Sequence, residues 1–98
     1  MVRYCFDIDG TLCSQESGDY LLAQPFEHRV EAVNRLFDEG HEIILFTARG
    51  SKSGLDWSSK TEEQIRSWGL RHHELLLGKP HADLYIDDKA LHPDLFDW

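Results

Sequence analysis

Long hydrophobic runs, cysteines and basic residues are all scarce in this sequence of 98 residues. No apolar run approaches the roughly 20 residues that a membrane-spanning helix needs, so no membrane partner is expected. The two cysteines, Cys5 and Cys13, lack metal-type spacing and are expected to be reduced thiols. The 10 basic residues are outnumbered by 18 acidic ones, and the net charge of −8 disfavours nucleic acid as a partner.

The chain is also short, which limits how it is organised. Its length predicts one domain over residues 1–98 and leaves no room for a separate domain that covers a substrate. The first apolar segment begins directly after Met1, without the charged and apolar regions of a signal peptide, so a cytoplasmic location is expected.

Hydrophobic periodicity predicts strands that alternate with helices. Apolar runs indicate strands at 2–6, 42–46, 74–77 and 83–86, and helical spacing indicates helices at 26–39 and 59–68. Ser59 and Glu62 form a capping-box pattern for the second helix, and the tail 91–98 is expected to pack as a cap or edge. The alternation predicts an α/β fold with a parallel sheet and functional groups at the carboxyl ends of its strands.

Two acidic residues, Asp7 and Asp9, stand one residue apart at the end of the first predicted strand, followed by Gly10. Close carboxylates repel each other unless a cation lies between them, and Mg²⁺ prefers such oxygen ligands and commonly shares them with phosphate. The pair therefore points to phosphoryl chemistry. As an alternative, both aspartates are ordinary turn residues, which are common where a strand ends.

Further polar residues at predicted strand ends complete a recognisable pattern. The segments Asp7-Ile8-Asp9-Gly10-Thr11, Thr47, Lys79 and Asp87-Asp88 resemble, in this order, the four motifs of the haloacid dehalogenase superfamily of phosphohydrolases. Within that superfamily, the sequence looks like a group of short, capless phosphatases that are often named for capsule or polysaccharide biosynthesis. The segments that carry this likeness are Gly18-Asp19-Tyr20, Thr47-Ala48-Arg49-Gly50, Gly78-Lys79-Pro80 and Tyr85-Ile86-Asp87-Asp88-Lys89. The resemblance implies a three-layer, doubly wound, Rossmann-like parallel sheet of about four strands, in the order 3-2-1-4, without a cap domain.

The resemblance also implies roles for individual residues. Asp7 would be the nucleophile that becomes an aspartyl-phosphate, and Asp9 would protonate the leaving group and then deprotonate water. Thr47 would donate a hydrogen bond to the phosphate, and Lys79 would bring a positive charge to it. Backbone N–H groups near Ile8, Asp9 and Ala48 would complete the phosphate site.

The same resemblance implies a Mg²⁺ cofactor. Its ligands would be the Asp7 carboxylate, the Asp9 carbonyl and Asp88, with Asp87 in the outer shell or as the alternative ligand. Arg49 has two open interpretations, because it follows Thr47 closely enough to contact the substrate and is equally suited to pair with an acid.

The predicted function is Mg²⁺-dependent hydrolysis of a small phosphomonoester, such as a sugar phosphate, by a phosphatase of this superfamily. Two alternatives stay open: a polynucleotide 3′-phosphatase, and a receiver-like module that accepts phosphate without hydrolysing it. A capless site would be open to water, so we expect the loop 12–25, the substrate or a second subunit to cover it. A homo-oligomer is one hypothesis that meets this need.

Overall fold

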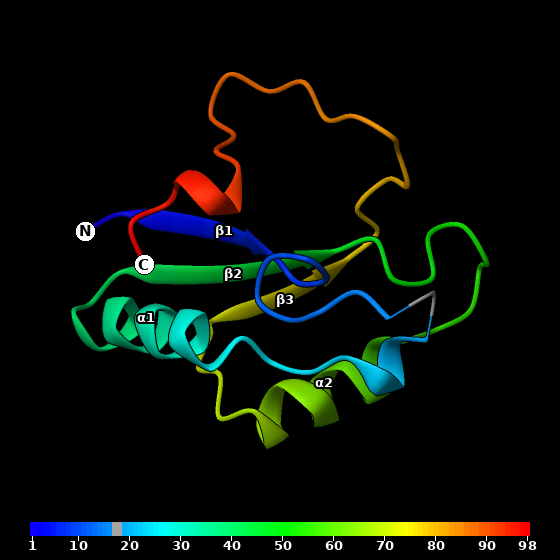
Figure 1. The fold of residues 1–98 in the computed structure, drawn as a ribbon, viewed down its shortest axis with the longest axis horizontal. Coiled ribbons are helices and arrows are strands. Elements are labelled where there is room, and N and C mark those ends of the chain that lie inside the picture. Colours follow the sequence, from blue (N-terminus) through cyan, green and yellow to red (C-terminus); the bar gives the residue numbers. More distant parts are fainter. Residues whose placement is uncertain (17–18) are drawn as a thin grey trace.

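A parallel sheet of three strands forms the centre of the molecule (Figure 1). The structure is a computed structural model that describes residues 1–16 and 19–98, so Gly18 lies outside the described residues. The strands are β1 (Arg3–Asp7), β2 (Glu42–Thr47) and β3 (Glu74–Leu77), in the spatial order β1-β2-β3. The helices α1 (Glu27–Asp38) and α2 (Ser58–Ser67) connect them. The predicted α/β class and parallel sheet are confirmed.

The hydrophobic pattern explains the central strand and the first helix. Ile43, Ile44 and Leu45 are all buried, as expected for a strand flanked by two others. Val30 and Val33 lie on the buried face of α1. The helix stops before Gly40, whose φ of 94° is a conformation that residues with a side chain rarely adopt.

The start of α2 differs from the prediction. The helix begins at Ser58, and its N-cap is Trp57, which makes no side-chain capping hydrogen bond. The predicted capping box of Ser59 and Glu62 was therefore wrong. Asp56 takes over this role, because its Oδ1 accepts hydrogen bonds from the Ser58 N–H at 2.9 Å and from the Ser58 hydroxyl at 2.6 Å. The Asp56 carboxylate, which precedes the helix, can accept from the first N–H of α2, whereas Ser59 already lies inside the first turn.

The core lies on one face of the sheet. Phe6, Leu45, Val33 and Ile65 belong to one buried cluster, so side chains from both helices pack against the same strand face. Among residues 1–16 and 19–98, no helix covers the opposite face, where Leu76 is 45% exposed. The expected three-layer, doubly wound arrangement is not seen in the described residues.

The fourth predicted strand, 83–86, is absent from the part of the chain that the structure describes. Every residue from 80 to 92 is exposed, and this segment, which we call the 80–92 arm, arches away on the β1 side of the sheet (Figure 1). Of the predicted strand order 3-2-1-4, the part 3-2-1 is confirmed, and the placement of a fourth strand beside β1 was wrong for this conformation.

A short connection explains why the 80–92 arm does not form this strand. The N–H of Lys79 donates to the Thr47 carbonyl at 3.1 Å, which holds Lys79 at the carboxyl end of the sheet, in line with β3. A parallel strand beside β1 would have to begin at the opposite end of the sheet from Lys79, about 13 Å back along the strand direction. It would also lie three strand spacings, or about 14 Å, to the side of β3, so the chain would have to span roughly 19 Å from Lys79. From Lys79 to Asp83 the chain extends at most about 14 Å.

The C-terminal tail packs as a cap, as predicted. After the 3₁₀ turn Pro93–Leu95, the Phe96 ring lies 6.0 Å from Tyr4 and 5.8 Å from Phe6, and the Trp98 ring lies 5.7 Å from Phe6. None of the helices in the described residues is both long and apolar enough to cross a lipid bilayer.

Candidate active site

Asp7 ends β1 and holds a partly exposed carboxylate at the edge of the sheet. The Lys79 ammonium lies 3.3 Å from its Oδ1, and the Thr11 hydroxyl donates to its Oδ2 at 3.0 Å. The structure thus brings together two of the predicted residues that are 72 positions apart in sequence. The contact keeps one oxygen beside a cation and leaves the side chain 33% exposed to solvent.

Lys79 is fixed by its own backbone as well as by Asp7. Besides the bond from its N–H to Thr47, its carbonyl accepts a hydrogen bond from the Ser51 hydroxyl at 2.6 Å. Its ammonium also lies 4.5 Å from the centre of the Tyr85 ring, a cation–π contact. The positive charge is therefore presented at a defined position beside Asp7.

Thr47 ends β2, and its side chain is buried, with 1% of the residue exposed. Its Oγ1 accepts a hydrogen bond from the Arg49 N–H at 3.1 Å. Because a hydroxyl both accepts and donates, its hydrogen stays available for a further acceptor. Thr47 therefore suits the predicted role as a donor to an anion at this edge.

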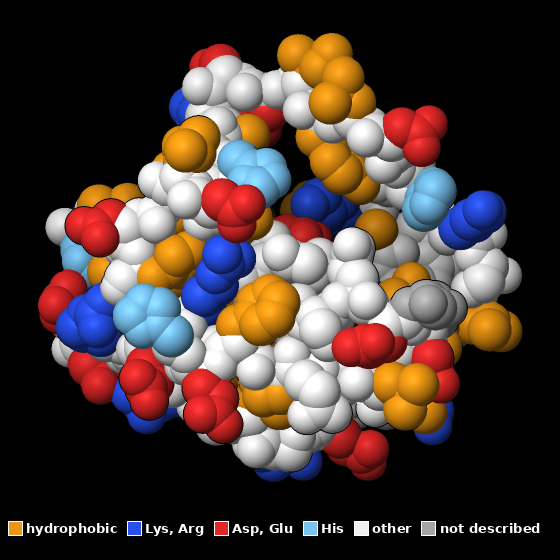
Figure 2. Space-filling model, viewed as in Figure 1, with side chains coloured by type: hydrophobic (Ala, Val, Ile, Leu, Met, Phe, Trp, Pro, Cys, Tyr) orange, Lys and Arg blue, Asp and Glu red, His pale blue; other side chains and the backbone are white. Residues whose placement is uncertain are grey.

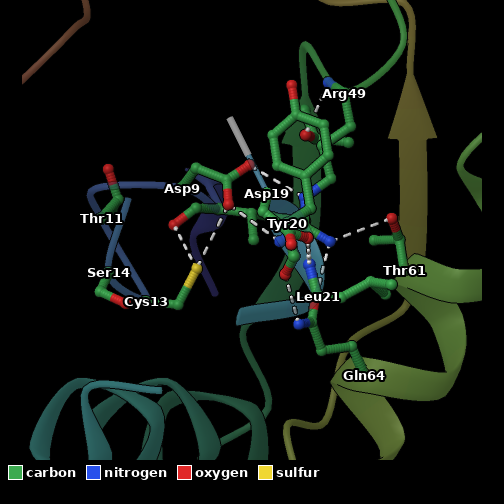
Figure 3. Close-up of polar contacts among 12 residues, drawn as sticks. Asp9, Thr11, Cys13, Ser14, Asp19, Tyr20, Leu21, Arg49, Thr61 and Gln64 are labelled. Atoms are coloured by element: carbon green, nitrogen blue, oxygen red, sulfur yellow. Dashed lines mark hydrogen bonds and ion pairs between the residues drawn. The ribbon is translucent and has the colours of Figure 1, made fainter. Parts of the chain in front are cut away.

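Asp9 is held by Arg49 through two parallel hydrogen bonds (Figure 3). Arg49 Nε lies 2.9 Å from Oδ2, and Nη2 lies 2.8 Å from Oδ1. The Arg49 side chain is only 1% exposed and that of Asp9 is 15% exposed, so this is a largely buried ion pair. Of the two interpretations of Arg49, the contacts match pairing with an acid.

The remaining contacts of Arg49 link the loop after β2 to α2 and to Tyr20 (Figure 3). Its Nη1 donates to Thr61 Oγ1 at 3.2 Å and to Gln64 Oε1 at 2.7 Å, both on α2. The Tyr20 ring lies 4.8 Å from the guanidinium carbon. Burial alone would lower the pKa of Arg49, but the hydrogen bonds and the charge of Asp9 outweigh it and raise the pKa above its ordinary value.

Sequence reasoning gave no site role to Tyr20, Thr61 or Gln64. For Tyr20 the signal was its place in the Gly18-Asp19-Tyr20 segment of the resemblance, and for Thr61 and Gln64 it was their spacing of three residues, which places them on one face of a helix. Tyr20 also bonds to this face, because its carbonyl accepts a hydrogen bond from Gln64 Nε2 at 2.8 Å. These residues surround Arg49 and leave its guanidinium little freedom to move.

Cys13 is buried beside Asp9. Its Sγ lies 3.5 Å from Asp9 Oδ1 and 3.6 Å from the Ile8 carbonyl oxygen, so its single S–H can donate to either acceptor. Burial, followed by the charge of Asp9, raises the pKa of the Cys13 thiol to about 12. Cys13 therefore stays protonated, and it is a free cysteine as predicted.

The acid pair Asp87 and Asp88 does not lie with the other predicted site residues. Both residues are exposed on the 80–92 arm, and Asp87 Oδ1 accepts a hydrogen bond from the Lys89 N–H at 2.9 Å. Among the described residues, no three histidine, cysteine, aspartate or glutamate side chains lie close enough to hold a metal ion. The 80–92 arm that carries this pair arches away from the strands, including β1 with Asp7 at its end (Figure 1), so the magnesium donor set expected from the sequence is not assembled within one copy in this conformation.

Comparison with known proteins places the fold. The structure is similar to that of a protein from Vibrio cholerae solved as an MCSG target, with a TM-score of 0.83 and 28% identity over 96% of this chain and 85% of that chain. It is also similar to a chain of the Pnkp1/Rnl/Hen1 complex, with a TM-score of 0.62 and 18% identity over 89% of this chain and 30% of that chain. No protein-family model and no curated protein matches the sequence. The second likeness shows the fold alone.

Proposed function

We propose that this chain hydrolyses phosphomonoesters as a phosphatase of the haloacid dehalogenase type, with Asp7 as the nucleophile. The observation that carries the proposal is the position of the Asp7 carboxylate, which ends β1 beside the Lys79 ammonium and the Thr11 hydroxyl. A second acid, Asp9, follows two residues later, and the buried Thr47 ends the neighbouring strand.

In the first step, an Asp7 carboxylate oxygen attacks phosphorus and forms the aspartyl-phosphate, while the bond from phosphorus to the leaving oxygen breaks. Phosphoryl transfer spreads negative charge over the phosphoryl oxygens, which the Lys79 ammonium stabilises and the Thr47 hydroxyl contacts. In the second step, water attacks phosphorus, the bond to Asp7 breaks, and inorganic phosphate is released.

Asp9 would handle the protons in both steps. It would enter the first step in its protonated form and give that proton to the leaving oxygen, and it would take a proton from the attacking water in the second step, which restores the acid for the next turnover. Because both of its oxygens bond to Arg49, one of them must exchange that partner for the leaving oxygen. Arg49 would thus act as a positioning residue for Asp9 rather than as a contact to the substrate.

The proposal keeps the Mg²⁺ ligands that the sequence resemblance implies. Asp7, the Asp9 carbonyl and Asp88 would hold it, with Asp87 as the alternative, but the residues of one copy do not fit such a site in this conformation. We therefore derive no step through the metal. Oxygen-rich donors would favour Mg²⁺ over Zn²⁺ if the set came together.

The substrate class rests on charge and on space. The net charge of −8 favours a small phosphorylated metabolite over a polyanion. An open hollow of about 210 Å³, lined in part by Ser51, Leu55 and Gly78, lies beside Arg49 and offers room for a leaving group such as a sugar.

The test is release of inorganic phosphate from p-nitrophenyl phosphate and a panel of sugar phosphates and 3′-phosphorylated oligonucleotides, with and without Mg²⁺. We expect Asp7→Asn to lower turnover by about a thousandfold or more, because it removes the nucleophile. Asp38→Asn is the matched control, since Asp38 is an exposed acid that pairs with Arg71 at the end of α1. Full turnover in Asp7→Asn, or a stable phosphoprotein without phosphate release, would contradict the proposal.

A further inference from the structure

The 80–92 arm carries apolar side chains into solvent. Leu84 is 74% exposed, Ile86 is 91% exposed and Leu91 is 56% exposed, which is unusual for a short apolar run. Figure 2 shows hydrophobic side chains along the arm, together with an opening between the arm and the body of the molecule. Both ends of the arm are held, by Lys79 at one end and by the packed Phe96 and Trp98 at the other.

The sheet has a matching open edge. β1 pairs with β2 on one side, and within the described residues its other edge has no strand partner. Cys5 on β1 is exposed, and the Arg3 side chain is 64% exposed. A free strand edge presents unpaired N–H and C=O groups that can bond to another extended segment.

We propose that the 80–92 arm pairs as a parallel strand with β1 of a second copy of this chain, and that two copies exchange their arms reciprocally. The arm cannot make this pairing with its own β1 while Lys79 is held, because the connection is too short by several ångströms. In a second copy this limit does not apply. Exchange of an identical element between protomers is an established route to a dimer.

Charge and polarity select the register. Placing Asp83 beside Arg3 aligns opposite charges, and it sets Leu84 and Ile86 beside Tyr4 and Phe6. Because alternate residues of a strand share a face, Leu84 and Ile86 then lie on the apolar face of the partner's sheet, where Phe6 joins the core. The two most exposed apolar side chains of the arm become buried in this register.

The same register has a consequence for the active site, which rests on the proposed function. It sets Asp87 beside the partner's Asp7, where the two carboxylates would repel each other unless a cation lies between them, so each site would be completed as a cation site by acids from the other copy. One copy would supply Asp7, Asp9, Thr47 and Lys79, and its partner would supply Asp87 and Asp88. The exchange of arms would explain why Asp87 and Asp88 lie apart from the other predicted site residues within one copy.

A disulfide test separates pairing between copies from pairing within one copy. The register places Tyr85 beside the partner's Cys5, and neighbouring strands lie about 4.8 Å apart, which suits a disulfide. We expect Tyr85→Cys to give a covalent dimer on a non-reducing gel after mild oxidation, and the same variant carrying Cys5→Ser to give none. An intramolecular disulfide in a monomer, or no Cys5-dependent cross-link, would overturn the proposal.

Sedimentation velocity supplies the second measurement. We expect the unmodified chain to be a dimer and Ile86→Asp to be a monomer with unchanged helix content. Leu55→Asp is the matched control, since Leu55 is 65% exposed in the loop between β2 and α2 and belongs to neither the arm nor β1, and this variant should stay dimeric. A monomeric unmodified chain, or a dimer that survives Ile86→Asp, would overturn the proposal.

Mixed dimers then test the shared site. Asp7→Asn and Asp88→Asn are each expected to be inactive, whereas co-refolding them in equal amounts should restore about a quarter of the normal activity, because half the dimers are mixed and each has one intact site. No recovery, with exchange shown by the cross-link in the same variants carrying Tyr85→Cys, would refute only the shared site. A Tyr85→Cys variant that cross-links while the unmodified chain releases no phosphate would refute the proposed function and leave the arm exchange standing.

Discussion

At the scale of single residues, Arg49 decides how the site is built. A buried arginine needs its charge and its donors satisfied, and the carboxylate of Asp9 meets both needs with two parallel bonds. The same carboxylate is the one that the proposed reaction uses for proton transfer. Removing Arg49 should therefore disturb both the stability of the fold and the position of Asp9.

We expect Arg49→Met to lower the free energy of unfolding by about 3 kcal/mol, because it leaves Asp9 without its partner in a buried place. Urea unfolding measures this change. Arg71→Met is the matched control, since the pair of Arg71 and Asp38 is exposed on both sides and its loss should cost less than about 1 kcal/mol.

A second readout distinguishes positioning of Asp9 from a structural role alone. p-Nitrophenolate leaves without a proton, whereas an alkoxide needs one from Asp9. We expect Arg49→Met to slow hydrolysis of a sugar phosphate at least tenfold more than hydrolysis of p-nitrophenyl phosphate, provided that both are measured on folded protein. An equal loss on both substrates would argue against the positioning role.

Cys13 makes the stability of the fold depend on pH in alkaline solution. Its thiol has a pKa of about 12 in the folded chain, against 9.0 without the protein environment. Above pH 9 the unfolded chain therefore loses this proton while the folded chain keeps it, so the stabilisation is complete below pH 9 and is lost as pH rises toward 12.

The measurement is urea unfolding of the unmodified chain and of Cys13→Ala between pH 7 and pH 10.5. We expect the unmodified chain to lose about 2 kcal/mol more than the variant over this range. Cys5→Ala is measured alongside, because partial burial also raises the pKa of the Cys5 thiol. Parallel pH profiles for the unmodified chain and Cys13→Ala would contradict the assignment of the raised pKa.

At the scale of elements, the loop after β2 depends on Gly50. Its φ is 82°, and a Cβ at this position would lie 2.2 Å from the Leu55 carbonyl oxygen, which is too close for any contact. The loop therefore closes tightly only with glycine here. Because Arg49 directly precedes this turn, the turn also sets the direction from which Arg49 enters the site.

We expect Gly50→Ala to lower the free energy of unfolding by about 2 to 4 kcal/mol, from backbone strain plus displacement of the loop. Gly54→Ala is the matched control, because Gly54 has a similar φ of 77° but open space around its Cβ position. This control should cost only about 1 kcal/mol. Chemical denaturation measures both, and equal losses would show that the close approach to Leu55 has no effect.

Elements with a strong hydrophobic pattern could be predicted from the sequence. The apolar run 42–46 predicted β2 because both faces of a central strand are buried, and the strand-end rule predicted that Asp7 and Lys79 meet. The segment 83–86 has equally strong strand residues, yet it is exposed. A local hydrophobic pattern shows that a segment favours a strand. Whether that segment pairs with the sheet also depends on whether the chain before it is long enough to reach a free strand edge.

At the scale of the whole molecule, the site could be predicted only in part. Asp7, Thr47 and Lys79 lie at strand ends, so the topology alone brings them to one edge of the sheet. The contacts of Arg49 with Tyr20, Thr61 and Gln64 depend on how α2 and the loop before α1 are placed on the sheet. No spacing along the chain encodes that placement.

The strands lie in space in the same order as along the chain, and this has a consequence for biosynthesis. Each strand can add to the one made just before it, so the sheet can grow in step with translation, from the N-terminus onward. The 80–92 arm emerges only after β3 is complete. A nascent chain can therefore complete its own sheet before it has made the segment that we propose it exchanges with a second copy.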